Sequence, residues 1–72
     1  MNRQPADNRT VAKRIKQCRI NFGLSQNQMA EKLGIQKQTY RKVERGKVGT
    51  GTDRLVKVCE ILEINLLWLI SE

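Results

Sequence analysis

The chain has 72 residues, a formal net charge of +7 and no histidine. This length leaves room for one small domain with a limited core. There is no apolar run that could span a membrane, and because residues 1–9 are polar we expect no signal peptide. The two cysteines are far apart in sequence and form no CxxC motif, so we expect free thiols in a reducing cytoplasm, no metal site and no cofactor.

Residues 1–9 show no hydrophobic periodicity and contain Pro5. We therefore expect a flexible N-terminal arm, followed by a single domain over residues 10–72. Arg3 and Arg9 could bring this arm to a phosphate or into a minor groove. The simpler interpretation is a frayed terminus that has no role.

The first helix is expected over residues 11–22, with Thr10 as its N-terminal cap. Apolar side chains recur there at the spacing of one buried helical face, namely Val11, Ile15, Cys18 and Phe22. The charged and amide residues Lys13, Arg14, Lys16 and Gln17 should be exposed. Gly23 should end the helix, and Leu24 should enter the core.

Residues 25–46 have the pattern of two short helices joined by a tight turn. Ser25 can cap the first, because its hydroxyl can accept a free N–H of the first turn. Met29, Ala30 and Leu33 then share one face. Gly34 stands where the helix must stop in the left-handed conformation. Small Ala30 would allow a second helix to cross closely, which is helix-turn-helix geometry.

The second of these helices has a divided surface. Tyr40 and Val43 form an apolar pair that should point inward, while the opposite side carries Lys37, Gln38, Arg41, Lys42 and Arg45. Amides can bond adenine, and Lys or Arg can bond guanine, on base edges in the major groove. We interpret this helix as a DNA recognition helix, although a solvated charged face is the simpler alternative. The candidates for base contacts are Gln36, Lys37, Gln38, Arg41 and Lys42.

This stretch resembles the helix-turn-helix of lambda repressor, Cro and the wider XRE-type bacterial regulators. The residues that carry the resemblance are Gln26, Ala30, Gly34, Tyr40, Val43, Glu44 and Gly46, without insertions. The resemblance extends over residues 11–70. Two positions depart from the family pattern: Gln36 replaces the usual Ser or Thr cap, and Tyr40 replaces a branched aliphatic residue.

The resemblance implies further roles. An ion pair between Arg19 and Glu44 would tie the first helix to the recognition helix. Gln26 would meet a phosphate at the N-terminus of its helix. The loop over residues 47–52 would lie along the DNA backbone. The phosphate candidates are Gln26, Arg45, Lys47 and Thr52.

Two helices should complete the domain. Thr52 should cap one over residues 53–62, and Asn65 should cap a short one over residues 66–70. The last helix has more apolar side chains than one short helix can bury, and an exposed apolar patch marks an interface. We expect a dimer interface formed by Ile64, Leu67, Trp68 and Ile70. Alternatively, this tail only closes the core.

Charge is unevenly divided, since residues 1–47 hold twelve of the fourteen Lys and Arg but three of the seven Asp and Glu. These features predict an all-α five-helix bundle with a helix-turn-helix, the lambda repressor-like DNA-binding domain. We expect a sequence-specific regulator of double-stranded DNA, most simply a repressor, which binds a palindromic operator as a homodimer.

We expect this regulator in the cytoplasm, on bacterial or phage DNA, with no small-molecule ligand. We expect no enzymatic activity, because no histidine, paired carboxylates or phosphate-binding loop could support catalysis. The main rival is a protein-interaction module of the antitoxin or anti-repressor type on the same scaffold. A further alternative is non-specific nucleic-acid binding.

Overall fold

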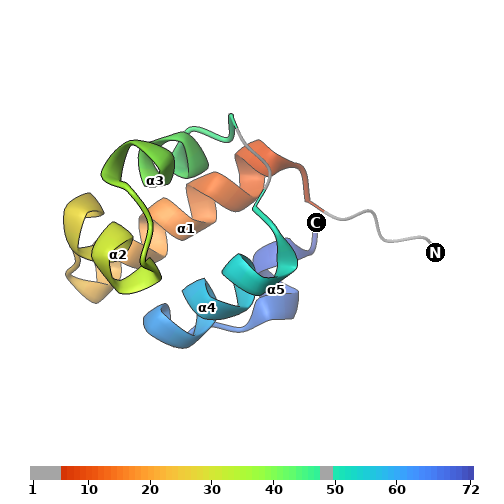
Figure 1. The fold of residues 1–72 in the computed structure, drawn as a ribbon. Coiled ribbons are helices and arrows are strands. Elements are labelled where there is room, and N and C mark those ends of the chain that lie inside the picture. The colour runs from red at the N-terminus through yellow and green to blue at the C-terminus, as the bar shows by residue number, and fades with distance from the viewer. Residues whose placement is uncertain (1–5, 48–49) are drawn as a thin grey trace.

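The computed structural model describes residues 6–47 and 50–72, which form five helices (Figure 1). They are α1 (Asn8–Phe22), α2 (Gln26–Leu33), α3 (Lys37–Glu44), α4 (Thr52–Leu62) and α5 (Leu66–Ile70). The expected all-α fold of five helices is confirmed. Within the described part of the chain, every helix is too short or too polar to cross a membrane.

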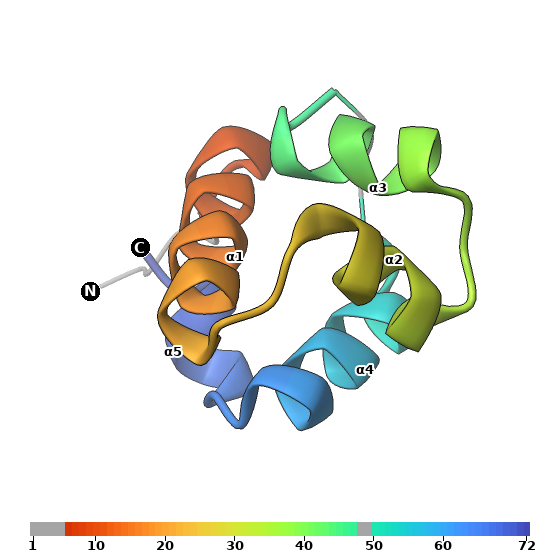
Figure 2. The same ribbon diagram turned by 90° about the vertical axis from the view of Figure 1, so that its left-hand side faces the viewer.

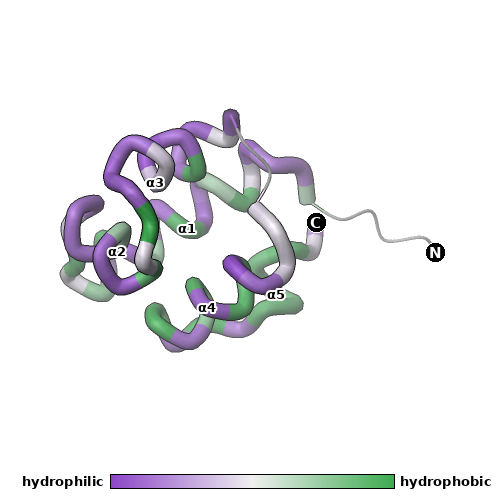
Figure 3. Tube along the Cα trace, viewed as in Figure 1, coloured by the Kyte–Doolittle hydropathy of each residue, from purple (hydrophilic) through white to green (hydrophobic). Residues whose placement is uncertain are grey.

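The long helix α1 is the common support of the fold. It packs against α3, α4 and α5, while α2 packs against α3 and α4. Figure 2 shows α3 at one edge of the molecule and α4 with α5 at the opposite edge. The hydropathy in Figure 3 follows the same division, because α3 is mostly hydrophilic and the segment around α5 is mostly hydrophobic.

One apolar core joins all five helices. Its largest fully buried side chains are Tyr40, Ile15, Met29, Leu69, Val43 and Val58. Because α5 contributes Leu69 to this core, the short last helix is an integral part of the domain. Half-buried Leu66, Ile64 and Ile70 pack against the same core.

The N-terminal cap of α1 is Asp7, so the expected cap at Thr10 is wrong. The Asp7 carboxylate accepts a hydrogen bond from the Thr10 backbone N–H at 2.8 Å, and this bond lowers the pKa of Asp7. Asp is as good an N-cap residue as Ser and better than Thr. Asp7 also stands three residues before Thr10, whose backbone N–H has no partner within the helix. The helix therefore starts at Asn8 and includes Arg9, which we expected in the arm.

The expected arm over residues 1–9 is thus shortened from its C-terminal side. Its residues 1–5, including Arg3, lie outside the described residues. Ala6 is held against the other end of the domain, where its backbone N–H donates to the Ile70 carbonyl at 2.8 Å. In Figures 1 and 2 the first coloured segment before α1 lies next to the C-terminal end of the chain.

Two side chains of α1 depart from their predicted burial. Phe22 is 45% exposed although the apolar spacing placed it in the core, and Arg14 is half-buried although it was expected to be exposed. Gly23 ends α1 in the left-handed conformation directly after Phe22, so the chain turns before this ring can reach the core. Arg14 is partly covered because its side chain reaches the end of α5.

At α4 the expected cap, Thr52, is also wrong, here by one residue. Gly51 is the N-cap and Thr52 is already the first helical residue, so no side chain caps this end. At α5 the prediction holds, since the Asn65 side chain accepts from the Trp68 backbone N–H at 3.0 Å. Cys18 is half-buried and Cys59 is buried, both as free thiols, and burial raises the pKa of each.

Candidate nucleic-acid interface

The unit of α2, turn and α3 has the predicted local chemistry. The Ser25 hydroxyl accepts from the Gln28 N–H at 3.0 Å, and the Gln28 side chain accepts from the Ser25 N–H at 2.8 Å. This capping box starts α2 firmly. Gly34 ends it with φ +70°, and Ala30 is 1% exposed. These residues fix the short turn that places α3 across α2.

The recognition helix candidate α3 has one buried and one exposed side. Tyr40, Val43 and Glu44 are buried. All five base-contact candidates are exposed, namely Gln36, Lys37, Gln38, Arg41 and Lys42. Gln36 is the N-cap of α3 but makes no side-chain cap bond. Its amide is therefore not committed to the helix end.

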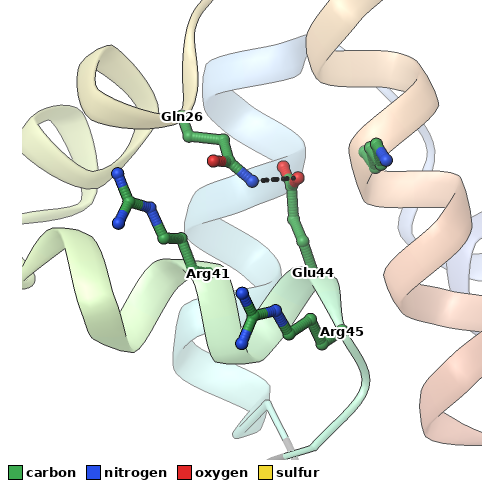
Figure 4. Close-up of a pocket in the computed structure, with 5 residues that line it drawn as sticks. Gln26, Arg41, Glu44 and Arg45 are labelled. Carbon is green, nitrogen blue, oxygen red and sulfur yellow. Dashed lines mark hydrogen bonds between the residues drawn. The ribbon is translucent and has the colours of Figure 1, made fainter.

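Glu44 is the centre of a buried hydrogen-bond network that joins three helices. Arg19 donates to it through Nε at 2.6 Å and through a terminal nitrogen at 3.3 Å, which is a bidentate ion pair. Gln26 donates its side-chain amide to the same carboxylate at 3.0 Å, as Figure 4 shows. The Tyr40 hydroxyl donates to it as well. Arg19 also donates to the Leu24 carbonyl at 2.7 Å.

The charge states in this network follow from these contacts. Burial alone would raise the pKa of Glu44, but hydrogen bonds from Arg19, Tyr40 and Gln26 outweigh burial and lower it below its ordinary value. Burial and the neighbouring carboxylate raise the pKa of Tyr40. Glu44 is therefore an anion with its charge compensated by donors, and Tyr40 is a neutral donor.

The Tyr40 hydroxyl and the Gln26 amide were not predicted as partners of Glu44. Tyr40 was expected only as an inward-pointing core residue, and Gln26 was expected only at a phosphate. One signal was available in the sequence, because Tyr40 and Glu44 are four residues apart and share a helical face. The departure from the aliphatic family pattern thus has a structural purpose: the hydroxyl satisfies a buried carboxylate.

A cationic cleft of about 310 Å³ lies beside this network (Figure 4). It is lined by Lys16 of α1, Gln26 of α2, and Arg41, Glu44 and Arg45 of α3. Because Glu44 is already compensated, three cations give the cleft a positive character. Sequence reasoning assigned no role to Lys16, since nothing local indicates that α1 borders α3 at that residue.

The remaining phosphate candidates lie outside this cleft. Lys47 is exposed three residues after the end of α3, and Thr52 is exposed at the start of α4. Between them, Val48 and Gly49 of the expected backbone loop lie outside the described residues. The structure thus brings Gln26 and Arg45 together and leaves Lys47 and Thr52 at the two ends of the loop.

The expected dimer residues divide into two groups. Leu67 is 70% exposed and Trp68 is 50% exposed, whereas Ile64 and Ile70 pack against the core. The Arg14 guanidinium lies 5.5 Å from the centre of the Trp68 ring. It also donates to the Trp68 carbonyl at 2.9 Å and to the carbonyls of Leu69 and Ser71. Arg14 therefore holds the end of α5 against α1.

Two helices with a tight turn, an exposed basic face on the second helix and an adjoining cationic cleft define a helix-turn-helix domain. Residues 15–69 match the family model described as Helix-turn-helix. The chain belongs to the XRE/Cro-type helix-turn-helix family, whose members include HTH-type transcriptional regulators.

Known proteins agree with this assignment. The chain is 40% identical over 58 residues to the SPbeta prophage-derived uncharacterized HTH-type transcriptional regulator YonR of Bacillus subtilis. That match covers 81% of this chain and 54% of the relative, so the chain spans about half the length of that protein.

Two solved structures are also similar. The restriction-modification controller protein C.AhdI from Aeromonas hydrophila superposes with a TM-score of 0.78 at 26% identity, over 85% of this chain and 92% of that one. SinR, the master regulator for biofilm formation, in a complex with DNA, gives a TM-score of 0.75 at 32% identity, over 82% of this chain and 95% of that one. A solved structure of the N-terminal DNA-binding domain of SinR comes from Bacillus subtilis.

Proposed function

We propose that this chain is a sequence-specific regulator that binds double-stranded DNA with α3 in the major groove. The observation that carries the proposal is the division of α3, whose exposed side offers only cations and amides while Tyr40, Val43 and Glu44 fix its orientation from within. Base edges would be read by Gln36, Lys37, Gln38, Arg41 and Lys42. The similarity to SinR, solved in complex with DNA, supports this docking.

The proposed phosphate contacts are Gln26, Arg45, Lys47 and Thr52. Gln26 uses one amide hydrogen on Glu44, and the NH₂ group has a second one. Its side chain is thus held in place before DNA arrives, which lowers the entropy cost of binding. Phosphate contacts of this kind position the domain and carry no sequence information.

We further propose a homodimer that reads a near-palindromic operator with half-sites about 34 Å apart. Leu67 and Trp68 are the exposed apolar pair that a two-fold interface would bury. Ile64 and Ile70 would support this surface from the core side. A dimer bound in this way would cover its operator on the cytoplasmic DNA and act as a repressor.

The test is selection from a random duplex library with the purified chain, followed by sequencing. A palindromic motif is expected and would identify the operator. Enrichment without a motif, with binding that disappears at moderate salt, would contradict sequence-specific recognition. In that case a protein-interaction module would become the better interpretation of the scaffold.

Substitution Leu67→Glu or Trp68→Ala is expected to shift the chain from dimer to monomer in sedimentation velocity at micromolar concentration. Leu67 is the better probe, because its 70% exposure means that a charge there costs the monomer little. Val56→Glu on α4, where Val56 is 38% exposed, is the matched control and should leave the profile unchanged. If the chain remains a dimer with either substitution, α5 is not part of the interface.

Lys47→Ala is expected to weaken binding to operator and unrelated DNA alike. Removing one phosphate contact should reduce the slope of log K against log salt by about 1. Fluorescence anisotropy at four salt concentrations on both duplexes measures this slope. A weakening confined to the operator would instead place Lys47 on a base.

A further inference from the structure

Three cations on α1 are not among the proposed DNA contacts. Arg9, Lys13 and Lys16 recur at spacings of four and three residues, so they share one face of the helix. All three are exposed. Over residues 6–47 and 50–72 the ion pair that the structure shows is Arg19–Glu44, so none of these three cations forms an ion pair there.

Two contacts fix the direction of this face. At one end, Lys16 lines the cationic cleft together with Arg41 and Arg45. At the other end, Arg9 lies against Gly46, just after α3, where an added Cβ would come within 3.0 Å of the Arg9 Cα. Lys13 lies between them on the same face. The row therefore runs alongside the C-terminal part of α3.

The electrostatic surroundings favour an anion along this row. Helix α1 contains no acidic residue; the pKa of its cap, Asp7, is lowered first by the hydrogen bond from Thr10 and also by the charge of Arg9. The acid that lines the cleft, Glu44, is compensated by Arg19, Tyr40 and Gln26. Charged helix faces are usually just solvated, but such faces usually mix both signs. Here Lys13 and Lys16, which form no ion pair within the described residues, continue directly from the cleft.

We infer that α1 is a further DNA-contacting element, whose row of Arg9, Lys13 and Lys16 follows the phosphate backbone beside the groove that α3 enters. The inference rests on the proposed DNA binding and extends its phosphate footprint. From Arg9 to Lys16 the row is about 10 Å long, enough for two or three successive phosphates of one strand. The contacts are electrostatic and independent of sequence.

The test is the double substitution Lys13→Gln/Lys16→Gln, which keeps part of each side-chain stem and removes two charges. The matched control is Lys32→Gln/Lys57→Gln, which removes the same charge from exposed positions on α2 and α4 that do not line the cleft. Affinity is measured by anisotropy against salt, on the selected operator and on an unrelated duplex. Circular dichroism melting checks that both double variants fold.

The expected result is a decrease of about 1.8 in the slope of log K against log salt for the α1 variant, equal on both duplexes. The control should change the slope by much less. A slope that changes no more than in the control, or a weakening confined to the operator, would overturn the inference. The proposed function is tested separately by the library selection with the wild-type chain. That chain must bind DNA and select a motif before either variant is compared with it.

Discussion

Glu44→Ala is expected to lower the free energy of unfolding by about 3–5 kcal/mol, because it leaves the Arg19 guanidinium buried without its counter-ion. The Tyr40 hydroxyl, which is fully buried, loses its acceptor in the same step. A domain of this size rarely has more than about 3–5 kcal/mol from its core. Urea denaturation followed by circular dichroism should therefore show a chain that is largely unfolded without denaturant.

A triple variant separates the unpaired charge from reduced packing. Arg19→Met/Tyr40→Phe/Glu44→Leu removes all three buried polar groups and keeps similar volumes, so it should recover most of the missing stability. A single variant Glu44→Ala that costs less than about 1 kcal/mol would show that water reaches Arg19 and that the pair contributes little. Equal destabilisation in both variants would point to packing instead.

Gln38→Ala is expected to cost about 1–3 kcal/mol of binding on the selected operator and to relax the preference at one base pair in each half-site. Gln38 lies on the exposed side of α3. The fold should be unaffected, since the side chain buries nothing. Repeating the library selection with the variant measures the change of preference.

The contrast with Lys47→Ala makes this prediction specific. Removing a phosphate contact at Lys47 lowers affinity for every sequence, whereas removing a base contact at Gln38 lowers it for the operator and leaves unrelated DNA unchanged. An unaltered selected motif for Gln38→Ala would remove this residue from base recognition. The adjacent candidates Lys37 and Arg41 would then be tested in the same way.

Local signals were sufficient for much of the fold. Ser25, Gly34 and Asn65 act where their chemistry predicts, because capping and left-handed turns depend on a few adjacent residues. The divided surface of α3 also follows from spacing alone. The predicted caps at Thr10 and Thr52 failed because an alternative cap stood nearby, at Asp7 and Gly51.

The contacts that spacing cannot predict are those between distant helices. Phe22 fits the apolar period of α1 but is exposed, since the turn at Gly23 comes too early for it to be covered. Arg14 has the sequence pattern of a surface charge, but its guanidinium donates hydrogen bonds to carbonyls of α5. Lys16 gains its position only because α3 lies beside α1. Tertiary packing, which no single helix encodes, decides all three.

The hydrogen bond from the Ala6 backbone N–H to the Ile70 carbonyl places the first and last described segments of the domain side by side. A linker of a few residues could therefore close the backbone into a ring without moving a helix. New termini could then be opened in the turn between α4 and α5, while α2 and α3 remain in one continuous piece. The surface that the helices of this domain build therefore does not depend on the order in which they follow one another along the chain.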